Sequence, residues 1–434
     1  MTALTLTGVT AERNGAPLWA PLDLRLPKGQ ALLVSGPTGC GKSTLLQILA
    51  GIQPISGGDL RRPNRCGLVL QDPNLQLLRD QIGPEVALGL ETQGVPSKQM
   101  KARVRQALDL VELDLPLNHP TRALSLGQKY RVLMAAQLVS RPELLLLDEP
   151  WAQLDDQGFA QLQALLNRLK RQGLTLVITE HHSDGYGDLI DHHRWLTQSG
   201  LGQPPQPDSQ CQSLALPPPV APASALLQLT AMTLTLGNQD RLKASALAIH
   251  PGECVQLWGN NGSGKTTLLR ALCGLTAAPD GQVMVLNRPP RLDSHGGQLA
   301  LVCQEPARQL SATTVAEELR LSLRQLGLPE SQCRQQADQQ LAQLGLSTLA
   351  DRSPLTLSYG QQHLVAIASQ LCRQPRLLLL DDPFAGLDAD SSQRLWRALA
   401  QRLQRGGAVL IASHRPLPLS HRQWHIEAGE IHEG

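Results

Sequence analysis

Aromatic side chains are scarce in this sequence, making up 3% of its 434 residues. Proteins that bind single-stranded nucleic acid without sequence preference stack successive bases on such rings, so this class is excluded. Net charge is also nearly absent, because 39 lysines and arginines face 37 aspartates and glutamates, which leaves a formal charge of +2. A protein that relies on diffuse attraction to nucleic acid or anionic lipid needs more charge of one sign. We therefore expect no nucleic-acid partner.

Long apolar runs and paired cysteines are missing as well. No uninterrupted apolar run approaches the roughly 18 residues that span a bilayer. The opening segment, MTALTLTGVTAERNG, has neither the basic region nor the apolar core of a signal peptide. The eight cysteines form no C-x-x-C pair, so we expect reduced thiols rather than disulfides or a zinc site. These absences predict a soluble chain in the cytoplasm.

The sequence does contain an internal repeat. Its length allows two or three domains at about 150 residues each. Gln71 and Ser125 are 54 positions apart, and so are Gln304 and Ser358. Asp148 follows Ser125 by 23 positions, and Asp381 follows Ser358 by the same number. His181 and His414 each follow the aspartate of their own half by 33 positions. Identical spacings of this kind predict a duplicated domain.

The two copies are joined by a segment of biased composition. Residues 197–225 are rich in Pro, Gln, Ser and Ala. We predict a first domain over residues 1–198, a linker over 199–225 and a second domain over 226–434. The prolines 217–219 favour an extended polyproline II segment. Such a segment tethers the halves at high effective concentration, or alternatively offers a docking site for a proline-binding module.

Strands alternate with helices in each half, which predicts an α/β fold with a mostly parallel sheet. Leu144–Leu147 and Leu377–Leu380 are apolar at every position, as interior parallel strands are. Residues 85–124 and 317–357 show helical patterns without strand signals, which predicts a helical insert in each half. One of these helices is expected to have Ser97 as its N-cap.

Both halves contain the pattern G-x-x-x-x-G-K-[ST] after a predicted strand. Its glycines let backbone N–H groups surround phosphates at a helix N-terminus, its lysine reaches the β- and γ-phosphates, and its hydroxyl binds Mg²⁺. A glycine-rich turn without this role is the alternative, which the repetition disfavours. The candidate nucleotide-binding residues are Gly36, Pro37, Thr38, Gly39, Cys40, Gly41, Lys42, Ser43 and Thr44, and in the second half Gly259, Asn260, Asn261, Gly262, Ser263, Gly264, Lys265, Thr266 and Thr267.

An aspartate ends each buried strand, at Asp148 and Asp381. This is where an aspartate holds Mg²⁺ through its hydration shell. A single aspartate after an apolar run is more often a cap, but the repeated spacing favours the metal role.

In this order the motifs resemble the nucleotide-binding subunits of ATP-binding cassette (ABC) proteins, over nearly the whole chain except the linker. The resemblance implies two tandem P-loop NTPase domains, each with a RecA-like parallel-sheet core, an antiparallel β subdomain and a helical subdomain. It also implies ATP and Mg²⁺ as cofactors. The metal ligands it implies are Ser43, Gln71, Asp148, Thr266, Gln304 and Asp381.

The same resemblance assigns the remaining motifs. Gln71 and Gln304 match the Q-loop glutamine, which also senses the transport partner. The segments LSLGQ and LSYGQ resemble the LSGGQ signature, whose serine and helix N-terminus meet the γ-phosphate held by the opposite half. Signature residues are Ser125, Gly127 and Gln128 in the first half and Ser358, Gly360 and Gln361 in the second. Asp155 and Asp388 match the D-loop, and His181 and His414 match the switch histidine.

The family's geometry implies two composite ATP sites formed by intramolecular pairing of the halves. Site one would combine Lys42, Ser43, Gln71, Asp148, Glu149 and His181 with Ser358 and Gly360. Site two would combine Lys265, Thr266, Gln304, Asp381, Asp382 and His414 with Ser125 and Gly127. ATP would hold the halves together and hydrolysis would release them.

The acid that polarises the attacking water differs between the halves. Glu149 fits the family pattern, whereas Asp382 at the matching position is one methylene shorter. Because a base misplaced by about 1 Å costs on the order of 100-fold in rate, we predict unequal sites with site one the faster. The alternative is a backbone shift that accommodates the aspartate.

Other departures concern the signature and the adenine site. The third signature residue, usually Gly, is Leu126 or Tyr359, but the following glycine remains. The usual adenine-stacking aromatic is missing before both phosphate loops, so nucleotide discrimination is expected to be loose. Arg13 could stack through its guanidinium, or it could be a solvated residue at a strand end.

Two reactive possibilities remain. Helix-terminal amides should favour the thiolate of Cys40, and a merely packed thiol is the alternative. His181, His182, His192 and His193 lie near Asp184, Asp188 and Asp191, but no helical ligand spacing supports a metal site there.

The segments after the Q-loop glutamines narrow the function. Both read Q-x-P-x-x-Q-L, and VALGLETQGVP follows the first. These residues resemble the ATPases of energy-coupling factor importers, which take up vitamins and transition-metal ions. The resemblance implies a transmembrane coupling subunit and a membrane substrate-capture subunit as partners, with the ATPase peripheral on the cytoplasmic face of the inner membrane. The alternatives are another ABC transporter type and a soluble ABC ATPase that acts on ribosomes or DNA.

Overall fold

The structure is a computed structural model, and it describes most of the chain. The described residues are 2–13, 15–154, 156–181, 185–205, 215–219, 224–230, 232–236, 240–276, 282–291 and 295–434. Asp155, His182 and Asp184, which the sequence singled out, lie outside them. The chain divides into two compact units, Met1–Asp208 and Ser209–Gly434.

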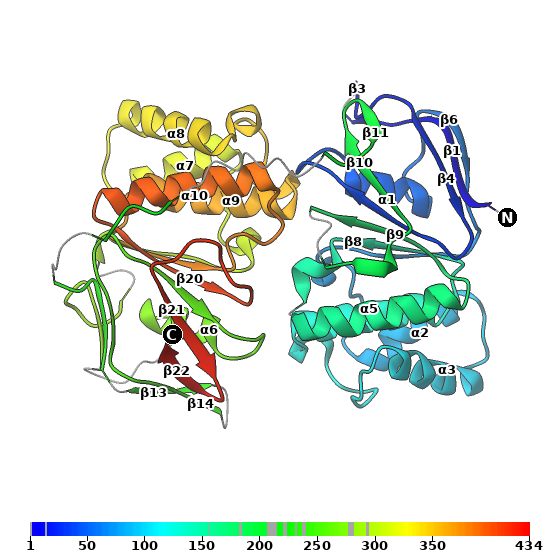
Figure 1. Ribbon diagram of the computed structural model, residues 1–434, viewed down its shortest axis with the longest axis horizontal. Helices are drawn as coiled ribbons and strands as arrows, with labels where there is room; N and C mark the ends of the chain where they lie inside the picture. The colour runs from blue at the N-terminus through cyan, green and yellow to red at the C-terminus, as the bar shows by residue number, and fades with distance from the viewer. Residues whose placement is uncertain are drawn as a thin grey trace. The chain divides into compact units, whose positions relative to one another are not determined.

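The first unit is built on a six-stranded sheet in which β7, β8, β9, β5 and β10 run parallel and β11 adds an antiparallel edge (Figure 1). The interior strand β8, which pairs with β7 and β9, is buried at all five positions, as its apolar run predicts. The bounds are β5 Ala31–Ser35, β7 Cys66–Val69, β8 Leu144–Asp148, β9 Thr175–Glu180, β10 His192–Thr197 and β11 Gly200–Gly202.

Alternate residues of these strands pack into two separate cores. Leu145 and Leu147 pack with the helical layer, α2 to α5, whereas Leu144 and Leu146 pack with α1 and with the antiparallel sheet β4–β1–β6. Both faces of the parallel sheet are therefore covered. The bounds are β1 Thr2–Thr10, β4 Leu22–Pro27, β6 Gly57–Arg61, α1 Lys42–Ala50, α2 Ile82–Thr92, α3 Ser97–Leu110, α4 Leu126–Leu138 and α5 Asp156–Arg171.

The second unit repeats this plan with a wider sheet. The strands β21, β16, β20, β19 and β18 run parallel, and β22 with the hairpin β13–β14 extends the sheet to eight strands. The bounds are β13 Met232–Leu236, β14 Asp240–Ala244, β16 Cys254–Trp258, β18 Leu299–Val302, β19 Leu377–Asp381, β20 Ala408–Ser413, β21 Arg422–Glu427 and β22 Glu430–Glu433.

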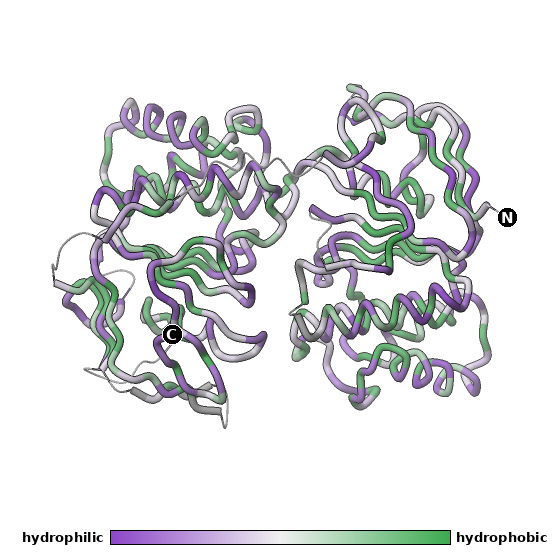
Figure 2. Tube along the Cα trace, in the orientation of Figure 1, coloured by the Kyte–Doolittle hydropathy of each residue, from purple (hydrophilic) through white to green (hydrophobic). Residues whose placement is uncertain are grey.

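Its two faces are covered in the same way. Leu378 and Leu380 pack with α7 to α10, and Leu377 and Leu379 pack with α6 and the small antiparallel sheet β15–β12–β17. The interior strands of both parallel sheets form a predominantly apolar layer in each unit (Figure 2), whereas β10 and β21 carry more polar residues. The bounds are β12 Leu227–Leu229, β15 Leu247–Ile249, β17 Val283–Val285, α6 Lys265–Leu272, α7 Val315–Arg324, α8 Glu330–Leu344, α9 Tyr359–Cys372 and α10 Ala389–Gln404.

This architecture confirms the predicted α/β fold with a parallel-sheet core, an antiparallel β layer and a helical layer in each half. One detail is wrong: Ser97 is the first residue of α3, and Pro96 stands at the N-cap without a side-chain hydrogen bond. Within the described residues, no helix combines the length and apolarity needed to cross a membrane.

Parts of the predicted linker contribute to the units. Gly200–Gly202 form β11 at the edge of the first sheet. Leu216 packs against the helical-layer core of the second unit, and the Pro217 carbonyl lies 2.9 Å from Nε2 of His421. Arg13 lies in β2, Glu12–Arg13, which forms a small exposed hairpin with β3, Ala16–Pro17.

Candidate active sites

The first phosphate loop joins the end of β5 to the start of α1, which begins at Lys42. The Lys42 ammonium folds back on the loop, donating to the carbonyls of Gly36 at 2.9 Å and Pro37 at 3.2 Å. Gly41 has a φ of 97°, and a Cβ there would lie 2.3 Å from the ring of Trp19. Only glycine fits at this position, because any side chain would be strained and would clash.

The second loop has the same form. Lys265 donates to the carbonyls of Gly259 at 2.7 Å and Asn260 at 2.9 Å. This loop borders a cavity of about 190 Å³, which brings the phosphate loop together with both carboxylates, the Q-loop glutamine and the switch histidine. The cavity is lined by Asn261, Gly262, Gly264, Lys265, Thr266, Thr267, Gln304, Asp381, Asp382 and His414.

The aspartates that end β8 and β19 are held by hydroxyl groups. Thr179 Oγ1 donates to Asp148 at 2.6 Å, and Ser43 adds a second hydrogen bond. Thr266 Oγ1 donates to Asp381 at 2.7 Å. Burial, with a neighbouring carboxylate, raises the pKa of Asp148, and burial raises the pKa of Asp381 to about 6.

These groups fit a magnesium ion. Hydroxyl, carboxylate and amide oxygens are the hard ligands that Mg²⁺ prefers. The raised pKa values of Asp148 and Asp381 reflect the free-energy cost of burying a carboxylate beside a second one. A bound divalent cation would offset that cost.

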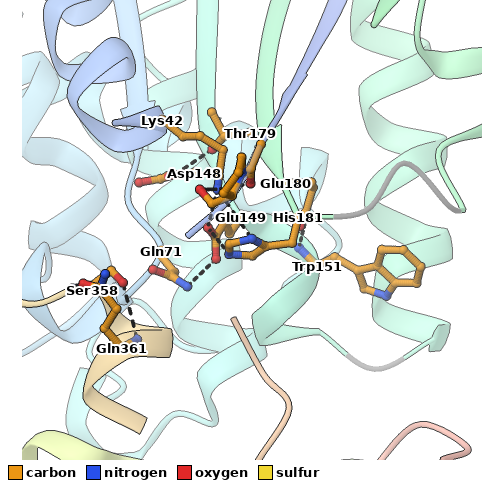
Figure 3. A network of polar contacts seen from close by, with 12 residues as sticks. Lys42, Gln71, Asp148, Glu149, Trp151, Thr179, Glu180, His181, Ser358 and Gln361 are labelled. Atoms are coloured by element: carbon orange, nitrogen blue, oxygen red, sulfur yellow. Dashed lines mark hydrogen bonds and ion pairs between the residues drawn. The ribbon is translucent and has the colours of Figure 1, made fainter. Parts of the chain in front are cut away.

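Glu149 is the centre of a polar network in the first unit (Figure 3). His181 Nε2 lies 2.8 Å from its Oε1, and Gln71 Nε2 donates to its Oε2 at 2.5 Å. Lys42 Nζ lies 4.0 Å from Oε1 and 3.4 Å from Nδ1 of His181. Burial alone would raise the pKa of the Glu149 carboxyl, but His181, Lys42 and Gln71 hold it below its usual value. The carboxylate is therefore ionised and able to accept a proton.

Asp382 has a different contact with its histidine. His414 approaches its Oδ2 through Nδ1, at 3.0 Å. The Nε2 atom of His414 is buried and has no hydrogen-bond partner among the described residues. Burial opposes ionisation of Asp382, but His414 and Arg415 hold its pKa below the usual value.

The signature serines cap the helices that follow them. Ser125 accepts the backbone N–H of Gln128 at 3.3 Å, and Ser358 accepts that of Gln361 at 3.4 Å, each within a capping box. Because each hydroxyl oxygen is used as an acceptor, its proton can still be donated to a phosphate. A Cβ on Gly360 would lie 2.0 Å from the Gly386 carbonyl, so packing within the second unit requires this glycine.

The structure therefore assembles, within each unit, the loop lysine, the Q-loop glutamine, both carboxylates and the switch histidine. Pairing of these groups with the signature serine of the other unit stays a prediction.

Three neighbours of the sites make contacts that the sequence did not indicate, although the sequence marks Tyr359 as a departure from the signature. Glu180 accepts hydrogen bonds from the Trp151 N–H and the Tyr186 hydroxyl, and burial raises its pKa to about 7. Tyr359 donates its hydroxyl to the carbonyl of Gln304 at 2.5 Å. Trp19 packs on Gly41 as described above. For Glu180 the only signal was a carboxylate directly before the switch histidine.

The structure describes the Cys40 thiol and two histidines, His192 and His193, of the cluster that the sequence singled out. The prediction of a favoured Cys40 thiolate is wrong, because burial outweighs the effect of Lys42 and raises the pKa of this thiol. His192 Nε2 lies 2.7 Å from Gln30 Oε1, and His193 Nε2 lies 2.5 Å from Ser35 Oγ. Among the described residues, no group of three or more His, Cys, Asp or Glu side chains could hold a metal ion.

Comparison with known proteins gives one family. A sequence model of the ABC transporter family matches residues 20–152 and 242–385. A protein of Bifidobacterium longum named as an ABC transporter ATP-binding protein is 31% identical, over 91% of this chain and 60% of that protein. A Methanosarcina acetivorans protein of the same name is 30% identical, over 92% of this chain and 83% of that protein.

Two more distant similarities extend the comparison. A Bacillus subtilis protein named as an HMP/thiamine import ATP-binding protein is 26% identical, over 93% of this chain and 85% of that protein. The ABC protein in a structure of ribosome-bound archaeal Pelota and ABCE1 has a TM-score of 0.72 at 20% identity, over 98% of this chain and 77% of that chain. At that identity the likeness shows the fold alone.

Proposed function

The chain belongs to the ABC transporter family and is an ATPase with two ATP-binding domains, and from this premise we propose that it energises an importer of the energy-coupling factor class. The importer would take up a vitamin or a transition-metal ion. The relative from Bacillus subtilis, named for HMP/thiamine import, supports this class of substrate.

We assign the chemistry to the residues of each network. Lys42 neutralises the β- and γ-phosphates, and Glu149 accepts a proton from the attacking water while His181 and Gln71 hold its carboxylate in place. Mg²⁺, when bound by Ser43, Gln71 and Asp148, would stabilise charge on the phosphates. The Ser358 hydroxyl would donate to the γ-phosphate from the opposite half.

The observation that carries the transport proposal is the surface beside Gln71. Leu75 and Leu78 are 76% and 73% exposed, whereas most large apolar side chains of the described residues are buried. Exposed apolar side chains grouped on one segment mark an interaction site. Because this segment begins at Gln71, whose amide bonds to Glu149, a membrane partner seated on it would reach the catalytic carboxylate through one side chain.

The second unit has a different surface at this place. Arg308 and Ser311 stand at the positions that correspond to Leu75 and Leu78, and Arg308 forms an ion pair with Glu305. The membrane coupling subunit would therefore meet an apolar segment on one unit and a polar one on the other. A substrate-capture subunit would join through the coupling subunit, placing the ATPase on the cytoplasmic face of the inner membrane.

Purification from membranes tests the proposal. The wild-type chain should co-purify with a polytopic membrane protein, and the double variant Leu75→Ser, Leu78→Ser should lose that partner while keeping its ATPase activity. Ile52→Ser is the matched control, because Ile52 is 67% exposed and belongs to the segment after α1 rather than to the Q-loop segment. Stable association with ribosomes and no membrane partner would overturn the transport role in favour of a soluble ABC ATPase.

We also propose that the two ATP sites are unequal. In support of this, both acids share a left-handed backbone, with φ of 47° at Glu149 and 52° at Asp382, while their side chains differ by one methylene. Thr179, which holds Asp148 in the first unit, is replaced by Ala412 at the paired position in the second.

A further inference from the structure

The last residues of β9 hold the end of β8 and the loop that follows it. Thr179 lies beside Asp148 in the parallel register and donates to its carboxylate. The Thr179 carbonyl accepts the Glu149 N–H at 3.0 Å, and His181 contacts the Glu149 carboxylate. Between these two residues, Glu180 reaches further along the loop.

The Glu180 carboxylate contacts the loop two residues beyond Glu149. Its Oε1 accepts the Trp151 N–H at 2.9 Å and the Tyr186 hydroxyl at 2.7 Å, and the residue is 5% exposed. Pro150 has no N–H, so the Trp151 N–H is the first backbone donor after Glu149. The backbone around Glu149 is therefore held at two points. The Thr179 carbonyl accepts the Glu149 N–H, and the Glu180 carboxylate accepts the N–H of Trp151, two residues later.

This support matters because the backbone of Glu149 is strained. A residue with a side chain at φ 47° persists only where its surroundings determine that conformation. Three of the chain's few aromatic residues enclose the support. Trp151 stacks on Phe159 with ring centroids 4.6 Å apart, and Tyr186 meets Phe159 edge-on at 5.1 Å.

The second unit uses a different arrangement. Ser413 stands where Glu180 stands in the first unit. Its hydroxyl lies 3.5 Å from Oδ1 of Asp382 and accepts the Arg415 N–H at 3.1 Å. Ser413 therefore contacts Asp382 and the backbone that follows its own strand, β20. Glu180 instead contacts the backbone that follows Glu149, at Trp151.

We propose that Glu180 is a positioning residue of site one, which fixes the strained turn at Glu149 by accepting the Trp151 N–H. The inference rests on the proposed role of Glu149 as the catalytic base. Glu180 acts through the backbone, so its effect falls on the placement of the Glu149 carboxylate and not on nucleotide binding.

Two substitutions of Glu180 test this in the full chain. Glu180→Ser, which introduces the residue of the second unit, should lower kcat about 10-fold or more with KM for ATP within roughly 2-fold of wild type. Glu180→Gln should retain most of the activity, because an amide oxygen can accept the same two hydrogen bonds. Equal losses in both variants, or a loss confined to KM, would contradict positioning.

A double-mutant cycle separates positioning from a general structural effect. If Glu180 acts through Glu149, then Glu149→Gln, Glu180→Ser should be no slower than Glu149→Gln alone. A further loss in the double variant contradicts the proposal. If Glu149→Gln itself leaves the rate unchanged, the proposed role of Glu149 fails instead.

A matched control accounts for stability. Glu253 is also buried and accepts a backbone N–H, from His250 at 2.7 Å, but it directly precedes β16, outside the assigned sites. Glu253→Ser should lower the melting temperature while leaving kcat per folded molecule unchanged. If Glu180→Ser does not fold, Tyr186→Phe, which removes one of the two donors to Oε1, should lower kcat by a smaller factor at unchanged KM. No change in kcat for that variant would then count against the proposal.

Discussion

His181 contacts Glu149 through its Nε2 atom, 2.8 Å from the carboxylate oxygen Oε1. Since Lys42 lies 3.4 Å from Nδ1, both ring nitrogens of this histidine have contacts within the first unit. In the second unit His414 uses Nδ1 for Asp382, which leaves its Nε2 without a partner among the described residues. Both halves therefore pair an acid with a histidine, but the histidine uses a different ring nitrogen in each half.

This difference predicts unequal effects of removing the two acids. Glu149→Gln should lower the ATPase rate on the order of 100-fold, because a displaced or missing base costs about that much. Asp382→Asn should lower it by less than about 3-fold, since the shorter acid contributes little turnover. Steady-state hydrolysis at saturating ATP and Mg²⁺ measures both, and equal losses would refute the asymmetry.

His363 predicts an acid-dependent stability of the second unit. This histidine of α9 is fully buried, neither ring nitrogen has a hydrogen-bond partner among the described residues, and burial lowers its pKa to about 4. The unfolded chain binds a proton below pH 6.5 and the folded chain does not, so stability is lost as pH falls from 6.5 to 4. The loss should reach about 3 kcal/mol.

Chemical denaturation at pH 7 and pH 5 measures the part of this loss that occurs above pH 5, about 2 kcal/mol. His363→Phe should flatten the acid dependence of unfolding. Tyr130, at the matching position of the first unit, is buried and uncharged at these pH values because its pKa is raised, so Tyr130→Phe should leave the dependence unchanged. A histidine variant that keeps the full dependence would assign the effect to another group.

Cys40 should be a slow nucleophile despite its place in the phosphate loop. Its pKa is raised by burial, so the reactive thiolate is rarer at neutral pH than for a free thiol. Peptide mass spectrometry after timed alkylation should show modification several-fold slower than in the denatured chain, with the rate rising above pH 9. Faster alkylation of Cys40 in the folded protein than in the denatured chain would instead indicate an activated thiolate.

Tyr359 ties the signature helix of the second unit to its Q-loop. Loss of the hydroxyl bond to the Gln304 carbonyl in Tyr359→Phe should reduce the stability of the second unit by about 1 kcal/mol. In the first unit Lys129 and Asn74 make the corresponding connection through an exposed hydrogen bond at 2.8 Å. Lys129→Met should therefore change stability by less than about 0.5 kcal/mol, and equal effects would count against the distinction.

Much of the fold could be predicted from sequence. The apolar runs that end at Asp148 and Asp381 form interior buried strands, and both glycine-rich loops lead into helices at Lys42 and Lys265. Periodicity and glycine content are local properties, so they are readable without contacts. The prediction of Ser97 as an N-cap is one residue too late, because Ser97 begins the helix and Pro96 is the N-cap. Proline has no side-chain acceptor, so the sequence carries no capping signal at that position.

The spacing of the motifs by itself determined the duplication, the order of the chemical groups and the difference between Glu149 and Asp382. Tertiary structure alone decided which atoms meet: the Nε2 contact of His181, the burial that raises the pKa of Cys40, and the place of Glu180 behind the loop at Trp151. The reason is physical. Covalent spacing sets which residues can end neighbouring strands, whereas burial and hydrogen-bond geometry arise only when distant segments pack together.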